Sequence, residues 1–218
     1  MNKPSLSWPN RITLLRILLI VPYVRLMLQL NDEAAGPWPR RIALLLFVIM
    51  ALSDGLDGYL ARRLNCSTTL GRFLDPLADK LLITCSCLLL ALPATAIPDL
   101  RLPLTVVVII IGKDIYTALG FLMIYLITHG MKIVPQFAGK LSTTIQLCMV
   151  SAILLAPDIL PHFGPWRYLV QGLWWSAGAL ALLTLIIYTR RGVRHVLEYE
   201  QKQSKHSQDP QQNGVTSE

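Results

Sequence analysis

The sequence reads DGLDGYLAR at residues 54–62 and GRFLDPLAD at residues 71–79. Four carboxylates therefore fall within 26 residues, two at the end of one apolar run and two at the start of the next. An ionised carboxylate near the centre of a bilayer costs roughly 2.5–3.5 kcal/mol, so such residues usually mark a functional site. Four of them together need a strong compensating charge, and the simplest is a divalent metal ion.

The composition indicates a polytopic membrane protein. Of the 218 residues, 53% are hydrophobic and only 15% are charged, whereas a soluble domain usually carries about 25% charged residues. The net charge of +7 does not indicate nucleic acid, because no continuous basic face with interleaved aromatic residues lies outside the apolar runs. We therefore expect no nucleic-acid partner.

Six apolar runs are each close to the roughly 20 residues that a membrane-spanning helix needs. A backbone inside hydrocarbon must satisfy its own hydrogen bonds, which favours helices over loops or open strands. The sequence thus predicts an all-α protein with six transmembrane helices near residues 12–30, 42–61, 73–92, 103–127, 141–161 and 168–189.

The basic residues predict the orientation. If the N-terminus is cytoplasmic, the cytoplasmic segments hold twelve lysines and arginines and the opposite side holds four, namely Arg40, Arg41, Arg101 and Arg167. This positive-inside bias requires an even number of spans. We expect both termini and the acidic stretches at the cytoplasmic face of a bacterial inner membrane.

The chain has room for one domain. We place the membrane domain at residues 1–192 and expect residues 193–218, which are polar and poor in apolar side chains, to form a disordered tail.

Helical spacing gathers the acidic residues on two faces. Positions 54, 57, 58 and 61 follow the i, i+3, i+4, i+7 pattern, and positions 71, 75 and 79 follow i, i+4, i+8. The short connection makes the two helices antiparallel neighbours, so both carboxylate pairs can meet in one cavity near the cytoplasmic boundary.

Hard carboxylate ligands suit Mg²⁺ or Mn²⁺, which leave open positions for phosphate oxygens. Neither histidine nor cysteine belongs to the cluster, which disfavours zinc. Arg62 and the small residues beside it suit a diphosphate and its nucleotide, and two metal ions are typical of phosphoryl transfer. The alternative is a set of loop-facing acids balanced by Arg62, Arg63, Arg72 and Lys80.

The pattern Asp-x-x-Asp-Gly-x-x-Ala-Arg, eight residues, Gly-x-x-x-Asp-x-x-x-Asp resembles the signature of the CDP-alcohol phosphatidyltransferase family at every fixed position. With the six-helix layout, the resemblance covers residues from about 5 to 192. It implies a homodimeric membrane enzyme that transfers a phosphatidyl or similar group from a CDP-linked donor to an alcohol and releases CMP.

The resemblance also implies roles for the residues of the motif. Asp54, Asp57 and Asp75 would bind two divalent metal ions. Asp79 would be a further ligand and the general base that accepts the proton of the acceptor hydroxyl. The CDP pocket would be lined by Gly58, Ala61, Arg62 and Gly71.

The stretch Asp75-Pro76-Leu77-Ala78-Asp79-Lys80 resembles the branch of phosphatidylglycerophosphate synthases and CMP-forming cardiolipin synthases, and so does the N-terminal stretch of residues 9–16. The implied donor is CDP-diacylglycerol. For glycerol 3-phosphate as acceptor, Lys113 and Lys140 would supply the cationic pocket. For Lys113, pairing with the adjacent Asp114 is the structural alternative.

Two departures from the branch keep phosphatidylglycerol open as the acceptor. Gly112-Lys113-Asp114 replaces the more usual Ala-Arg-Glu, and an arginine common about seven residues later has no counterpart near Gly120. A lysine lacks the two-pronged fork with which arginine holds phosphate.

A cation channel or transporter is a rival from another class. It predicts acids near the middle of the membrane and broken helices, whereas these acids lie at the ends of apolar runs.

Overall fold

The computed structural model describes residues 8–32, 34–64, 69–128 and 137–208. Within these ranges it contains six helices and no strand, so the all-α prediction is confirmed. The helices are α1 (Trp8–Met27), α2 (Trp38–Leu64), α3 (Thr69–Ala91), α4 (Leu104–Thr128), α5 (Phe137–Ile159) and α6 (Trp166–Gln208).

Prolines mark where several helices begin. Pro9 and Pro39 lie in the first turns of α1 and α2, while Pro103 and Pro165 immediately precede α4 and α6. Proline is tolerated there because its fixed φ suits a first turn, in which its missing N–H would have no helical partner.

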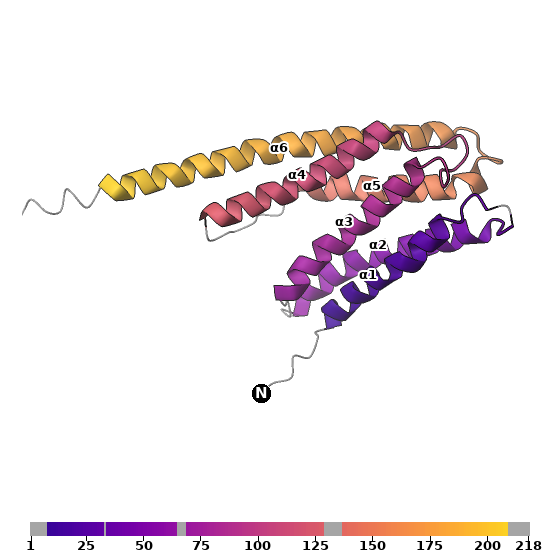
Figure 1. Ribbon diagram of the computed structural model, residues 1–218, viewed down its shortest axis with the longest axis horizontal. Helices are drawn as coiled ribbons and strands as arrows, with labels where there is room; N and C mark the ends of the chain where they lie inside the picture. The colour runs from indigo at the N-terminus through magenta and orange to yellow at the C-terminus, as the bar shows by residue number, and fades with distance from the viewer. Residues whose placement is uncertain (1–7, 33, 65–68, 129–136, 209–218) are drawn as a thin grey trace, which may run out of the picture.

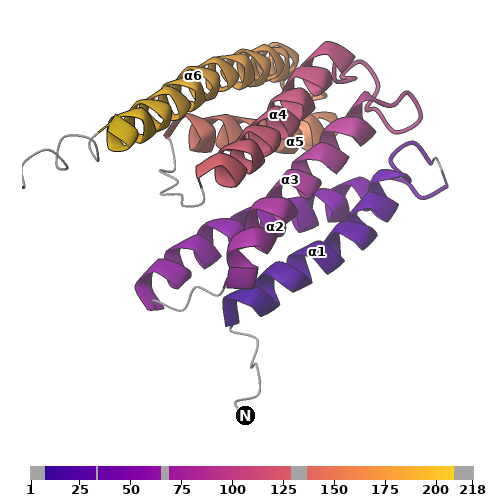
Figure 2. The ribbon, with the colours of Figure 1, turned by 60° about the vertical axis from the view of Figure 1, so that its left-hand side comes forward.

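The six helices form an up-and-down bundle. The first three pack on one another, and α6 packs on both α4 and α5 (Figure 1). The two groups meet where α2 contacts α5 and α3 contacts α4 and α5. The start of α1, the end of α2, the start of α3 and the end of α6 lie toward one end of the bundle (Figure 2).

The outside of the bundle is strongly apolar. Leu18, Val21 and Val108 are each about 70% exposed, and many other large apolar side chains are similarly uncovered. Within the described residues, two segments are long and apolar enough to cross a bilayer, Gly139–Ile159 and Trp166–Arg194, and the apolar segment Lys80–Ala91 is shorter. These features fit a membrane protein.

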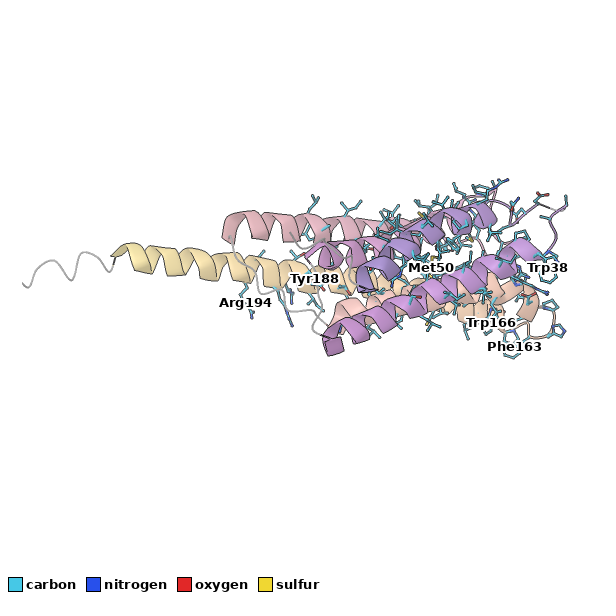
Figure 3. The ribbon with its side chains drawn as sticks, turned by 90° about the horizontal axis from the view of Figure 1, so that it is seen from below. Trp38, Met50, Phe163, Trp166, Tyr188 and Arg194 are labelled. Atoms are coloured by element: carbon cyan, nitrogen blue, oxygen red, sulfur yellow. The ribbon has the colours of Figure 1, made fainter. Side chains whose placement is uncertain are left out.

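The two ends of the bundle differ in their exposed side chains. Figure 3 shows Trp38, Phe163 and Trp166 near one end, and Tyr188 and Arg194 displaced toward the other. Trp38 and Phe163 are more than half exposed. Aromatic side chains commonly gather at the boundary between a membrane and water.

The structure corrects one expectation about the C-terminus. Residues 193–208, expected to be a disordered tail, continue α6 as helix up to Gln208. No glycine or proline interrupts residues 193–208, and glutamate, glutamine and lysine are good helix formers. Residues 209–218 lie outside the described part of the chain.

An ion-pair network joins α2 to α5 at the aromatic end. Arg40 donates from Nη1 to Asp158 Oδ2 (3.0 Å) and from Nη2 to Oδ1 (2.8 Å). Its Nη1 also donates to the carbonyl of Leu154 at 2.8 Å. Arg41 contacts Asp158 as well, at 3.0 Å. Because the Arg40 side chain is only 10% exposed, this two-pronged pair is a structural clamp.

We expect Asp158→Ala to destabilise the protein by about 1–3 kcal/mol, because it leaves a largely buried guanidinium without its carboxylate. The midpoint of thermal unfolding in detergent should fall by several degrees. Asp99→Asn is the matched control, since it removes the charge of the exposed Asp99–Arg167 pair (3.1 Å) and keeps a residue type that tolerates the positive φ at position 99, and such pairs contribute little. Equal midpoints for the two variants would contradict the clamp.

Candidate active site

The acidic motif lies on two consecutive helices. Asp54, Asp57, Gly58, Ala61 and Arg62 belong to the last turns of α2. The first turns of α3 carry Gly71, Asp75 and Asp79. The side chains of these residues lie outside what the structure describes, so their placement here rests on the helical backbone.

The backbone brings the two halves of the motif to the same end of the bundle. Only residues 65–68 separate Leu64, the last residue of α2, from Thr69, the first residue of α3. The end of α2 and the start of α3 lie close together in both views (Figures 1 and 2). The prediction that the motif occupies neighbouring antiparallel helices is therefore confirmed for the backbone.

Helix α1, which packs against α2 and α3, carries two buried polar side chains one turn apart. Thr13 is fully buried and Arg16 is 2% exposed. Sequence reasoning did not include either in the site. The signal was present in the N-terminal stretch 9–16, where Thr13 and Arg16 lie three residues apart, which is about one helical turn, and where residues 12–16 are otherwise apolar.

A charged cluster connects α3 to α4. Lys113 Nζ lies 2.9 Å from Asp114 Oδ1, and Lys80 Nζ donates to the same oxygen. The side chains of Lys113 and Asp114 are 4% and 8% exposed, whereas that of Lys80 is 41% exposed. The pairing of Lys113 with Asp114 that the sequence left open is thus present, and Lys80 joins it.

Lys140 lies apart from this cluster. It is exposed in the first turn of α5, and no contact among the described side chains connects it to Lys113. The neighbouring Gly139 faces Tyr188 of α6, whose hydroxyl oxygen would lie 2.8 Å from a Cβ at that position. A larger residue at position 139 would require the Tyr188 side chain to shift.

Further along α5, Ser142 and Gln146 are fully buried. Gln146 Nε2 donates to Ser142 Oγ at 3.3 Å, while Gln146 Oε1 has no partner within the described residues. In this part of the chain, only Lys140 was predicted from the sequence as a site residue. Two polar residues four positions apart on an apolar helix predict a polar face inside the bundle, and this pattern could have identified Ser142 and Gln146.

An open apolar groove runs along the outside of the bundle. Its volume is about 500 Å³, and α2, α5 and α6 form its walls. Residues Val48, Ala51 and Leu52 provide the α2 wall, so the groove ends within one turn of Asp54. It offers apolar surface beside the motif.

The donor set of the motif fits divalent cations. Four aspartates supply hard oxygen ligands on two adjacent helix ends, and these are the ligands that Mg²⁺ and Mn²⁺ prefer. Their shared helical faces would let the carboxylates converge.

The model of the CDP-alcohol phosphatidyltransferase family matches residues 6–191. The chain belongs to this family. The resemblance seen in the acidic motif is thereby confirmed, and the protein is a transferase of a family whose members generally depend on divalent metals.

Individual relatives of this CDP-alcohol phosphatidyltransferase fall into two groups. A CDP-diacylglycerol–glycerol-3-phosphate 3-phosphatidyltransferase of Pseudomonas fluorescens is 36% identical over 199 residues, which are 90% of this chain and 95% of the relative. The protein of the same name from Bacillus subtilis is 36% identical over 155 residues, covering 67% and 76%. A CMP-forming cardiolipin synthase of Oryza sativa is 29% identical over 172 residues, covering 75% and 52%.

Proposed function

We propose that this CDP-alcohol phosphatidyltransferase transfers the phosphatidyl group of CDP-diacylglycerol to glycerol 3-phosphate, giving phosphatidylglycerophosphate and CMP. The observation that carries the proposal is the similarity to the Pseudomonas fluorescens enzyme along 90% of the chain. The acidic motif on adjacent ends of α2 and α3 supports it.

In the proposed reaction, the acceptor hydroxyl oxygen forms a bond to the phosphatidyl phosphorus. The bond from that phosphorus to the bridging oxygen breaks, and CMP leaves. Asp79 accepts the hydroxyl proton as general base. Two divalent cations, held by Asp54, Asp57, Asp75 and Asp79, would neutralise the diphosphate charge.

The nucleotide end of the donor would lie against Gly58, Ala61, Arg62 and Gly71, where small residues let a ligand approach the helix backbone. The apolar groove bounded by Ala51 and Leu52 would accept an acyl chain directly from the bilayer, because hydrocarbon chains need no polar partner there. The buried Lys113 and the exposed Lys140 would contribute to the positive field that attracts the acceptor phosphate, without contacting it.

The same proposal includes the membrane topology. The six helices span the inner membrane of a bacterium, with both termini and the active site on the cytoplasmic side, and the protein acts as a homodimer. The exposed Arg190, Arg191 and Arg194, which directly follow the apolar part of α6, support this orientation, because positive charge favours the cytoplasmic face.

Phosphatidylglycerol is the second candidate acceptor, which would make the enzyme a CMP-forming cardiolipin synthase. The similarity to the Oryza sativa protein and the lysine at position 113 favour it. Parallel reactions with CDP-diacylglycerol and either acceptor test the choice. We expect phosphatidylglycerophosphate from glycerol 3-phosphate to form faster, and cardiolipin as the main product would contradict our proposal.

A further inference from the structure

The cluster of Lys80, Asp114 and Lys113 has an inner and an outer side. Lys113, 4% exposed, and Asp114, 8% exposed, form the buried side, and Lys80, 41% exposed, forms the accessible side. Both ammonium groups donate to one oxygen, Asp114 Oδ1. The buried Lys113 therefore neutralises Asp114 from within the bundle, and the surplus positive charge of the cluster lies at Lys80.

Lys80 keeps donors for a ligand. An ammonium group carries three N–H bonds, and among the described side chains Lys80 has one acceptor, Asp114. The other oxygen of that carboxylate, Oδ2, is buried and has no hydrogen-bond partner among the described residues. Asp114 thus accepts hydrogen bonds from both lysines. Its contact with Lys80 restricts the flexible Lys80 side chain to one position.

The position of Lys80 links this charge to the motif. Lys80 directly follows Asp79 on α3, and its side chain extends toward α4. An acceptor that gives its hydroxyl proton to Asp79 must hold its other groups within a few ångströms of that residue. The Lys80 side chain leaves the helix about 100° round the axis from position 79, so it can hold the phosphate at the opposite end of the same small molecule from the hydroxyl.

We propose that Lys80 binds the phosphate of the acceptor, and that Asp114, backed by Lys113, positions the Lys80 ammonium group. This inference rests on the proposed function, because it names a residue for its acceptor. It also gives the two lysines of the cluster different roles. The exposed Lys80 contacts the soluble substrate, and the buried Lys113 acts through Asp114.

The test uses the purified full-length protein, with CMP release measured while each substrate is varied. We expect Lys80→Met to raise the KM for glycerol 3-phosphate about tenfold or more, because a charge-assisted hydrogen bond to phosphate is lost. The KM for CDP-diacylglycerol should stay within about twofold, and Lys80→Arg, which keeps the charge, should largely restore the acceptor KM.

A second variant separates binding from packing. Lys80→Gln removes the charge but keeps an N–H donor, on a side chain one atom shorter. It should raise the acceptor KM like Lys80→Met while unfolding at nearly the wild-type temperature. Inorganic phosphate should compete with glycerol 3-phosphate in the wild type and much less in Lys80→Gln. Arg167→Gln, at the aromatic end of the bundle, is the control and should change neither KM.

The possible outcomes are distinguishable. If the wild type releases CMP with glycerol 3-phosphate but Lys80→Gln leaves the acceptor KM unchanged, the role of Lys80 is wrong and the proposed function stands. Equal rises in the KM for glycerol 3-phosphate and in the KM for CDP-diacylglycerol also overturn the proposed role of Lys80. If the wild type shows no turnover with glycerol 3-phosphate, the proposed function itself fails.

Discussion

Asp79→Asn is expected to lower the rate of CMP release by about 10²–10⁴-fold while leaving binding of the donor largely intact. A positioned general base contributes about 10²–10⁴-fold to a rate, and an amide cannot accept the proton. The amide oxygen remains a weak metal ligand, and the other three aspartates of the motif are unchanged. The loss should therefore appear in kcat rather than in the KM for CDP-diacylglycerol.

The matched control for this variant is Asp99→Asn. Asp99 lies between α3 and α4 at the aromatic end, and its side chain is 76% exposed. It should retain wild-type turnover. Donor binding can be followed separately as the rise in unfolding temperature on addition of CDP-diacylglycerol. Near-normal turnover in Asp79→Asn would remove Asp79 as the base.

Removal of divalent metal ions is expected to have an effect of similar size. An excess of chelator should abolish CMP release, because the diphosphate would then face four uncompensated carboxylates. Addition of Mg²⁺ or Mn²⁺ should restore the rate. The wild type should also lose its stabilisation by CDP-diacylglycerol when the metal is removed.

Asp57→Ala provides the comparison for the metal experiment. With one of four ligands missing, it should need a much higher Mg²⁺ concentration, or fail to recover at any concentration, whereas Asp99→Asn should follow the wild-type Mg²⁺ dependence. Full activity of the wild type in excess chelator would contradict a metal-dependent site.

The sequence predicted the existence of the six helices because each is marked by an apolar run. It predicted their ends less well, since hydropathy marks where a helix would enter a membrane rather than where its hydrogen bonding stops. The extension of α6 to Gln208 is the largest example. There, helix-forming polar residues continue a helix beyond its apolar part, with no breaker to end it.

The sequence also predicted the backbone placement of the acidic motif, because its spacing is local to two consecutive helices. It could not predict that Lys80 binds Asp114, 34 residues away, since that contact depends on how α3 packs against α4. Burial decided the roles within the cluster. The sequence predicted Lys113 in the acceptor pocket and Lys80 as a balancing charge, whereas Lys113 is 4% exposed and Lys80 is 41% exposed.

The most direct measurement is CMP release by the purified wild-type protein from labelled CDP-diacylglycerol in the presence of Mg²⁺. We predict release with glycerol 3-phosphate and essentially none without an alcohol acceptor. The absence of CMP with every alcohol supplied, phosphatidylglycerol included, would contradict the assignment of this chain as an active phosphatidyltransferase.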